Sequence, residues 1–118
     1  MNSRKKEFKI IPTQYNIILH AVNSDGIPMA YASILIKDKK DERIGHLMGL
    51  LRHPEFKGLG ICESLIKERI KLCETLRCSR IVTGVYKKRF NLINLYKSLG
   101  FKEIKSDSPN HIKLELIL

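Results

Sequence analysis

The chain has 118 residues, of which 43% are hydrophobic, so it is expected to form one folded domain over residues 1–118 rather than a disordered polymer. No apolar run approaches the roughly 20 residues of a membrane-spanning helix, and the basic start "MNSRKKEFKI" lacks the apolar stretch of a signal peptide, so we expect a cytoplasmic protein with no membrane partner. The formal net charge of +10 favours an anionic partner: a phosphorylated cofactor, a nucleic acid or an acidic protein.

The first half of the chain consists of strand-like segments separated by short polar turns. Apolar, β-branched and aromatic residues predominate in four stretches that we expect to be strands, namely 7–11, 15–22, 27–38 and 43–51. The sequences "NSDG" and "KKDE" supply turn residues between the last three. Links this short predict an antiparallel meander.

In the second half of the chain the spacing of apolar residues changes from that of strands to that of a helix. Between residues 60 and 76 apolar residues recur at helical spacing with charged residues between them, which predicts an amphipathic helix. A strand at 79–86, a helix at 89–99 ended by Gly100, and strands at 101–104 and 111–118 are expected to follow. This order predicts an α/β (α+β) domain with a mixed, mostly antiparallel central sheet and a right-handed βαβ unit.

The three cysteines, Cys62, Cys73 and Cys78, lie close together in the sequence without a Cys-x-x-Cys pair. Their odd number argues against a disulfide framework, and their spacing is not that of zinc ligands. We therefore expect free thiols and no metal site.

The stretch "HPEFKGLGICESL", residues 53–65, places Gly58 and Gly60 directly before the first predicted helix. A helix N-terminus presents free N–H groups and the positive end of the helix dipole, and glycines let an anion approach that backbone closely. Lys57 adds a positive charge. The stretch therefore predicts a phosphate or diphosphate cradle, with a plain strand-to-helix turn as the alternative. It is neither a P-loop nor a Rossmann fingerprint.

The segment "LLRHPEFKGLGICESLI" resembles the Gln/Arg-x-x-Gly-x-Gly/Ala signature of the GNAT superfamily, the acyl-CoA-dependent N-acetyltransferases. Further along, "NLYKSLGF" (94–101) resembles the Leu-Tyr-x-Lys-x-Gly-Phe segment of that family, at a family-like separation. The resemblance covers residues 15–118. It implies acetyl-CoA as the cofactor and direct attack on its thioester by an amine-bearing acceptor, which is a small molecule, a peptide N-terminus or a lysine.

The resemblance also implies which residues contact the cofactor. The backbone of the strand end at Leu50, Leu51 and Arg52 would pair with the pantetheine arm, and the thioester would lie where two strands splay apart near Leu51 and Val85. The diphosphate would be held by the glycine loop and the helix start: Lys57, Gly58, Leu59, Gly60, Ile61, Cys62 and Glu63.

The sequence departs from the family pattern in several places. Lys57 replaces the usual Gln or Arg, Cys62 replaces a small Gly or Ala, and Arg89 stands where many members have Asn. Only residues 12–14 separate the first two predicted strands, so the two helices that most members carry there would be absent. Because that region covers part of the acceptor site, a non-enzymatic GNAT-like domain that binds CoA or a protein is the alternative function. A second copy could cover the open side, which would make a homodimer.

Two residues are candidates for the chemistry. Tyr96 matches the family tyrosine, and its hydroxyl can donate a proton to the departing thiolate; ring packing is the alternative role. Many members use a strand Glu as general base, but "RIGHLMGLL" (43–51) has none. His46 on that strand is our candidate, because histidine has an ordinary pKa of about 6.5. His53, Glu55 and water are further candidates for the base.

Two other features have competing interpretations. A thiol at a helix N-terminus can have a lowered pKa, so Cys62 could act as a nucleophile, but packing of a small side chain is favoured. The basic cluster "YKKRF" (86–90) could bind nucleic acid through charge and stacking. Its expected place beside the cofactor favours contact with the 3′-phosphate of CoA, or plain solubility, so nucleic acid is not the favoured partner.

Overall fold

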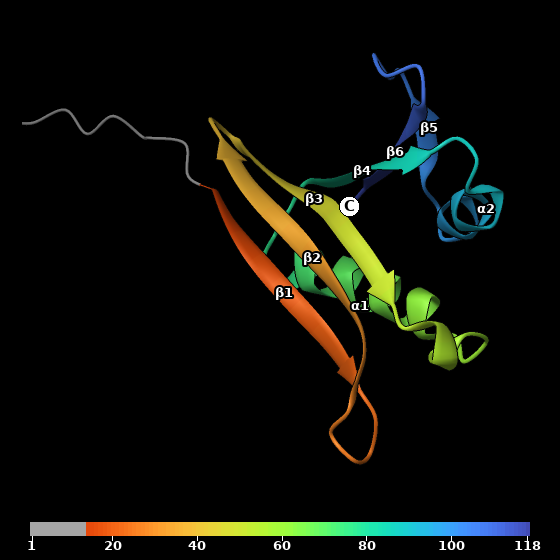
Figure 1. Ribbon diagram of the computed structural model, residues 1–118. Coiled ribbons are helices and arrows are strands. Elements are labelled where there is room, and N and C mark those ends of the chain that lie inside the picture. Colours follow the sequence, from red (N-terminus) through yellow and green to blue (C-terminus); the bar gives the residue numbers. More distant parts are fainter. Residues whose placement is uncertain (1–13) are drawn as a thin grey trace, which may run out of the picture.

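The computed structural model describes residues 14–118, which form a six-stranded sheet and two α-helices (Figure 1). The strand expected at 7–11 lies outside the described residues. The elements in chain order are β1 (Gln14–Val22), β2 (Pro28–Lys39), β3 (Glu42–Arg52), the single-turn 3-10 helix η1 (Pro54–Phe56), α1 (Ile61–Thr75), β4 (Arg80–Tyr86), α2 (Phe90–Ser98), β5 (Lys102–Ile104) and β6 (His111–Ile117). The sequence predicted all of these except η1, to within one or two residues at each end.

The strands lie in the order β1-β2-β3-β4-β6-β5. All neighbours run antiparallel except β3 and β4, which α1 connects as a parallel pair. The predicted fold class, a mixed and mostly antiparallel sheet with a βαβ unit, is therefore confirmed.

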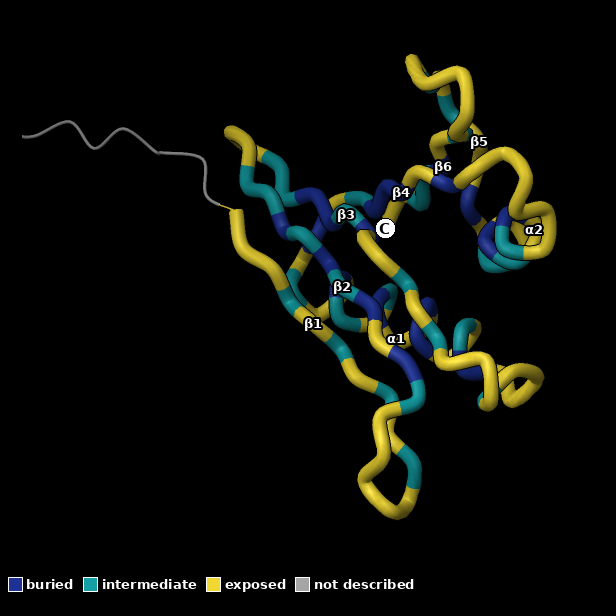
Figure 2. Tube along the Cα trace, in the orientation of Figure 1, coloured by how far each residue is buried: buried dark blue, intermediate teal, exposed yellow. Residues whose placement is uncertain are grey.

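One face of the sheet and the inner sides of both helices form the core. Strand register places Ile34, Leu47, Thr83 and Leu114 in a row across β2, β3, β4 and β6 on this face. Buried residues of α1 and α2, including Ile66 and Tyr96, join the same cluster. Figure 2 shows the buried positions concentrated in β2, β4 and the inner sides of the helices, whereas β1 at the edge is largely exposed. Both helices therefore cover the same face.

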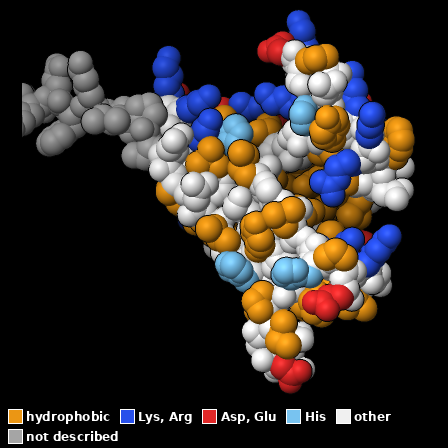
Figure 3. Space-filling model, in the orientation of Figure 1, with side chains coloured by type: hydrophobic (Ala, Val, Ile, Leu, Met, Phe, Trp, Pro, Cys, Tyr) orange, Lys and Arg blue, Asp and Glu red, His pale blue; other side chains and the backbone are white. Residues whose placement is uncertain are grey.

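The other face carries no helix within residues 14–118. Alternation along the strands directs Ile18, Tyr31 and Met48 to this side, and all three are exposed. Figure 3 views this face over β1–β3, with hydrophobic side chains across it and Lys and Arg side chains along its upper border. In the same part of the chain, no helix is long and apolar enough to cross a membrane.

Helix α1 packs very closely on β3. A Cβ atom at Gly45 would lie 2.6 Å from the Sγ atom of Cys73, so only glycine fits there without a shift of the Cys73 side chain or of the helix that carries it. The cysteines are free thiols, with Cys73 and Cys78 buried and Cys62 half-buried. Burial raises the pKa of Cys73 to about 12, so this thiol is a packing residue and not a reactive one.

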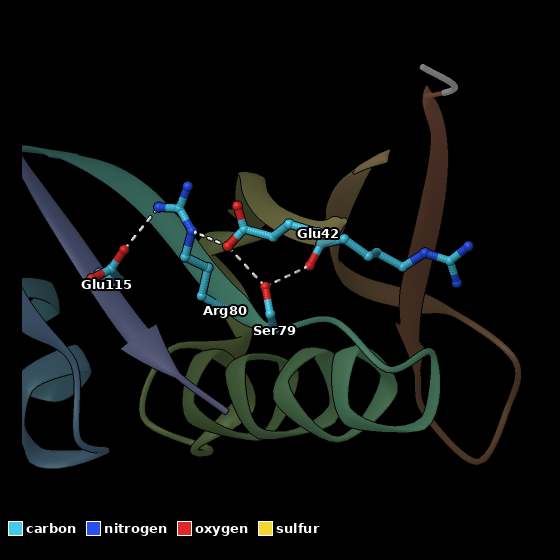
Figure 4. Close-up of polar contacts among 5 residues, drawn as sticks. Glu42, Ser79, Arg80 and Glu115 are labelled. Carbon is cyan, nitrogen blue, oxygen red and sulfur yellow. Dashed lines mark hydrogen bonds and ion pairs between the residues drawn. The ribbon is translucent and has the colours of Figure 1, made fainter. Parts of the chain in front are cut away.

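An ion-pair network fixes one end of the parallel strand pair (Figure 4). Arg80 at the start of β4 bonds to Glu42 of β3 and to Glu115 of β6, each at 2.8 Å. Ser79 Oγ also donates to Glu42 at 2.9 Å. The hydrogen bond from Arg80, together with that from Ser79, lowers the pKa of Glu42. These contacts join three neighbouring strands at their common end.

At the other end, β3 and β4 separate. Their pairing extends only from Ile44 with Arg80 to Leu47 with Thr83. Thr83 Oγ1 donates to the Leu47 carbonyl at 3.1 Å and ends the ladder. Beyond this point β3 stays paired with β2 while β4 stays paired with β6, and Figure 1 shows the two strands running apart. The opening between them is the aperture of the candidate site.

Candidate active site

A β-bulge in β3 lies at the edge of the aperture. Ala32 pairs with Leu50 and Ser33 pairs with Met48, so Gly49 is left without a partner on β2. Gly49 has a φ of 31°, a conformation that glycine adopts more readily than other residues. The bulge turns backbone carbonyl groups out of the ladder, and these need other hydrogen-bond donors.

Arg69 of α1 supplies those donors. Its side chain is only 1% exposed, and its Nη1 atom donates to the carbonyls of Ser33 and Met48 at 3.2 and 3.1 Å. Its Nη2 atom donates to the hydroxyl of Tyr96 at 3.4 Å. Within residues 14–118 no carboxylate pairs with this cation, so carbonyl and phenol oxygens compensate for its burial. Arg69 was not predicted from the sequence. A detectable signal was present, because Arg69 lies four residues from both Leu65 and Cys73 and so falls on the apolar face of the helix.

Tyr96 comes from α2 and faces the same space. Its ring is 3% exposed and packs edge-on against Phe101, with ring centroids 5.1 Å apart. Because arginine has donors only, Arg69 occupies a lone pair of the phenol oxygen and leaves the hydroxyl hydrogen free for another acceptor. Tyr96 is therefore arranged as a hydrogen-bond donor toward the cavity that it lines.

The glycine loop precedes α1 as expected. Gly60 is the N-cap residue of α1 with a φ of 71°, and a Cβ there would meet no atom within 4 Å. The loop thus requires glycine for its backbone conformation and leaves open space above the first N–H groups of the helix. That combination is suited to an anion.

An outer cavity of about 430 Å³ lies next to this loop. The first turns of both helices line it through Cys62 and Phe90, so the positive ends of two helix dipoles meet there. Four basic side chains also line it: Arg52, Lys57, Lys88 and Arg89. No acidic residue lines this cavity, and none of the four forms an ion pair with a described residue.

Two smaller cavities follow in a row, the first adjoining the outer cavity and the second adjoining the first. A middle cavity of about 200 Å³ shares Arg89 and Leu92 with the outer cavity and contains Arg69 and Tyr96. A far cavity of about 230 Å³ lies beyond the aperture, between β3, β4 and the β5–β6 loop. The middle and far cavities share five lining residues, Leu47, Met48, Thr83, Gly84 and His111. The three cavities thus adjoin in a row, which we call the passage, from the basic helix side, between the splayed strands, to the helix-free face, where Figure 3 shows a hollow beside β3.

His46, the candidate base, lines only the far cavity. Burial, and then the positive charges of Lys37, Lys39, Lys113 and Arg80, lower its pKa to about 4. Its Nε2 atom is buried and has no hydrogen-bond partner among the described residues. The imidazole is therefore neutral at pH 7 but weakly basic.

The structure brings some of the predicted residues together and separates others. Leu50 lines the middle cavity, and Arg52, Lys57 and Cys62 line the outer one, where Arg52 Nη1 lies 3.5 Å from Cys62 Sγ. Other predicted residues lie outside all three cavities: Leu51, Gly58, Leu59, Gly60, Ile61, Glu63, His53 and Glu55.

The residues outside the cavities have identifiable surroundings. The Leu51 and Leu59 side chains are exposed, whereas Ile61 is buried beside Ala30 and Ala32. Glu63 pairs with Lys67 at 2.8 Å on the helix surface. A role of these residues in cofactor binding would therefore rest on their backbone groups.

Comparison with known proteins agrees with this geometry. Residues 3–101 match the acetyltransferase (GNAT) family. The chain belongs to the GNAT family. No curated protein sequence matches it significantly, but many solved structures have the same fold.

Three of these solved structures illustrate how closely their folds resemble that of this GNAT chain. A crystal structure of the NatC complex bound to Gag peptide and CoA has a TM-score of 0.78 at 20% identity, over 86% of this chain and 70% of that one. The ribosomal-protein-S18-alanine N-acetyltransferase of Escherichia coli has a TM-score of 0.71 at 19% identity, with coverages of 86% and 68%. The PaiA N-acetyltransferase of Thermoplasma acidophilum in complex with coenzyme A has a TM-score of 0.72 at 18% identity, with coverages of 87% and 61%.

Membership of this family supports acetyl-CoA as the cosubstrate, and the residues present fit that molecule. The basic lining of the outer cavity complements phosphate groups, and the middle cavity leads from there to the aperture. Glycine at position 60 leaves the helix start accessible to an anion.

Proposed function

We propose that the protein is an N-acetyltransferase that moves an acetyl group from acetyl-CoA to an amine on a small molecule, a peptide N-terminus or a lysine. The observation that carries this proposal is the row of three adjoining cavities that leads from the basic outer cavity, past Tyr96, to the helix-free face. A passage of this form admits an anionic donor from one side and an acceptor from the other, and direct transfer needs both.

In the proposed complex, the outer cavity holds the phosphate groups. Arg52, Lys57, Lys88 and Arg89 supply positive charge, and the N-termini of α1 and α2 supply N–H donors. The free backbone edge of β3 near Leu50 would hydrogen-bond the pantetheine arm, because β4 no longer pairs with it there. Acetyl-CoA supplies the acetyl group as a thioester, whose carbonyl carbon the amine attacks.

Tyr96 is the proposed general acid. Its hydroxyl hydrogen is not used by Arg69, so the Oη atom can give a proton to the departing thiolate sulfur. The bulge at Gly49 presents backbone groups beside the same cavity. Packing against Phe101 holds the ring in place beside this cavity.

The test combines binding with turnover. We expect acetyl-CoA at a hundred times its Kd to raise the free energy of unfolding by about 2.7 kcal/mol, measured by thermal or urea unfolding. We further expect an N-acetylated product, detected by mass spectrometry, from at least one of spermidine, alanine amide and a short lysine peptide. Acetyl-CoA binding without any acetylated product would favour the non-enzymatic alternative, and absence of binding would contradict both.

A further inference from the structure

We infer that His111, and not His46, is the general base that removes a proton from the acceptor amine. This inference rests on the proposed acetyl transfer and names a residue for its proton-accepting step. His111 starts β6, directly after the β5–β6 loop, and lies outside both family-like segments.

The position of His111 in the passage is the first reason. Of the five residues shared by the middle and far cavities, His111 alone has a side chain that ionises. An acetyl donor entering from the helix side and an amine entering from the helix-free face would meet in this shared zone. A base for the amine has to be within hydrogen-bond reach of that meeting point.

The surroundings of the ring are the second reason. The Nδ1 atom of His111 lies 3.1 Å from Ser108 Oγ, and the ring lies against Tyr86 with centroids 4.9 Å apart and planes 34° from parallel. When Nδ1 donates its hydrogen to Ser108 Oγ, the lone pair on Nε2 is free to accept a proton. Ser108 and Tyr86 thus act as positioning residues for the imidazole.

The alternatives are less suitable. No Asp or Glu lines any of the three cavities, so within residues 14–118 no carboxylate is available. His46 has a lowered pKa and a buried Nε2, and it lies outside the shared zone. Glu55 and His53 line none of the cavities.

The proposed proton transfers balance with the reaction. The acceptor ammonium gives one proton to Nε2 of His111, and its nitrogen then bonds to the acetyl carbon while the C–S bond breaks. Tyr96 gives its hydroxyl proton to the departing thiolate, and the nitrogen loses its second proton to water. Solvent then restores the phenol and the neutral imidazole.

The kinetic test compares His111→Asn with His20→Asn as a matched control. His20 is also an exposed histidine on a strand with its ring near a tyrosine, Tyr31, at 6.1 Å, but it lies outside all three cavities. With the best of the three acceptors, we expect kcat/KM at pH 7 to fall about 10- to 100-fold in His111→Asn, the lower range for a general base. The control should keep wild-type kcat/KM.

The pH profile distinguishes a base from a structural residue. The loss in His111→Asn should shrink as pH rises above about 9, because the amine then loses its proton without help, and acetyl-CoA affinity should stay unchanged at every pH. The other ionisable groups that line the cavities with His111 are unchanged in both His111→Asn and His20→Asn, so they do not confound that comparison: Arg69, Tyr86, Arg89, Tyr96, His46 and Lys113. A pH-independent loss, or a loss in His46→Asn with none in His111→Asn, would overturn the assignment.

A second measurement does not depend on activity. Nuclear magnetic resonance of protein labelled with 15N-histidine should find neutral His111 with its hydrogen on Nδ1, and Ser108→Ala should change that tautomer. A hydrogen on Nε2 in the wild-type protein would contradict the proposal. Failure of the wild-type protein to acetylate any acceptor would overturn the proposed function as a whole, whereas turnover that survives in His111→Asn would overturn only the role of His111.

Discussion

The outer and far cavities lie at opposite ends of one passage but are constructed differently. The outer cavity comes from two continuous segments, 52–62 and 88–95, in which basic side chains flank two helix starts. The far cavity is assembled from short runs of three different strands, β3, β4 and β6, and from the β5–β6 loop, and its lining includes His46, Ser108 and His111. A site that recognises phosphate through backbone and charge leaves a short sequence signature, whereas a site for a particular acceptor leaves none.

A substitution that disrupts only the proposed phosphate-binding end of the passage should have the largest effect on acetyl-CoA binding. In Gly60→Asp a carboxylate occupies the space above the helix start, and we expect acetyl-CoA affinity to fall at least about 100-fold because like charges are brought together. Asp tolerates a positive φ better than most residues, so the fold should persist. Isothermal titration calorimetry measures the affinity.

Gly26→Asp is the matched control for this change. Gly26 has a φ of 78°, and a Cβ there would also meet no atom within 4 Å, but this glycine lies in the β1–β2 turn away from the passage. The variant should show a comparable loss of stability with normal acetyl-CoA affinity. Equal affinities in Gly60→Asp and the wild-type protein would mean that the glycine loop only turns the chain.

Tyr96→Phe should separate chemistry from binding. The ring and its packing on Phe101 are kept while the hydroxyl is removed, so kcat should fall about 10- to 100-fold with acetyl-CoA affinity nearly constant. Loss of the contact with Arg69 should lower the free energy of unfolding by about 1–3 kcal/mol, because a buried guanidinium donor is left without this acceptor. Tyr31→Phe, at an exposed tyrosine of β2, is the control, and an unchanged kcat in Tyr96→Phe would remove this tyrosine from the mechanism.

The smallest expected effect is on the pH dependence of the free energy of unfolding, and it comes from His46 in the far cavity. The folded pKa of His46 is lowered to about 4 from 6.5, so the unfolded chain binds its proton at higher pH than the native state does. Stability present above pH 6.5 should therefore be lost as pH falls toward 4, by about 1 kcal/mol after allowance for solvent screening. Urea unfolding of His46→Gln should show a shallower decline than that of His20→Gln. If the free energy of unfolding fell equally with pH in the two variants, the lowered pKa of His46 would be contradicted.

The sequence predicted the strands and helices because each has a regular period over many residues. Twelve alternating residues in β2 and fifteen amphipathic residues in α1 are strong local signals, and the glycine loop is a compact motif. The short parallel ladder ending at Leu47, the bulge at Gly49 and the turn at η1 depend on how strands meet in space. No local pattern encodes those features.

The candidate site also contains some residues that the sequence indicates and others that it does not. Tyr96 and Lys57 lie in family-like segments, so they could be proposed from the sequence, and both line the passage. Arg69 was obscured by the many charged residues of its helix. His111 gave no signal, because its role follows from the pairing of β6 with β4 and from a loop that aligns Ser108 with its ring.

The short ladder between β3 and β4 also has a consequence for how the molecule folds. The β1–β2, β2–β3 and β5–β6 pairs join near neighbours in sequence, whereas β4 pairs with β3 and with β6 across longer connections. Of these two long-range pairings the seam between β3 and β4 is the shorter, because it joins only residues 44–47 to residues 80–83. Closing the long connection between them costs entropy before the parallel pairs form. We therefore expect the seam to be the last part of the sheet to assemble and the first to open. The aperture that leads to the proposed acetyl-transfer site would then also be the least stable contact between strands in the sheet.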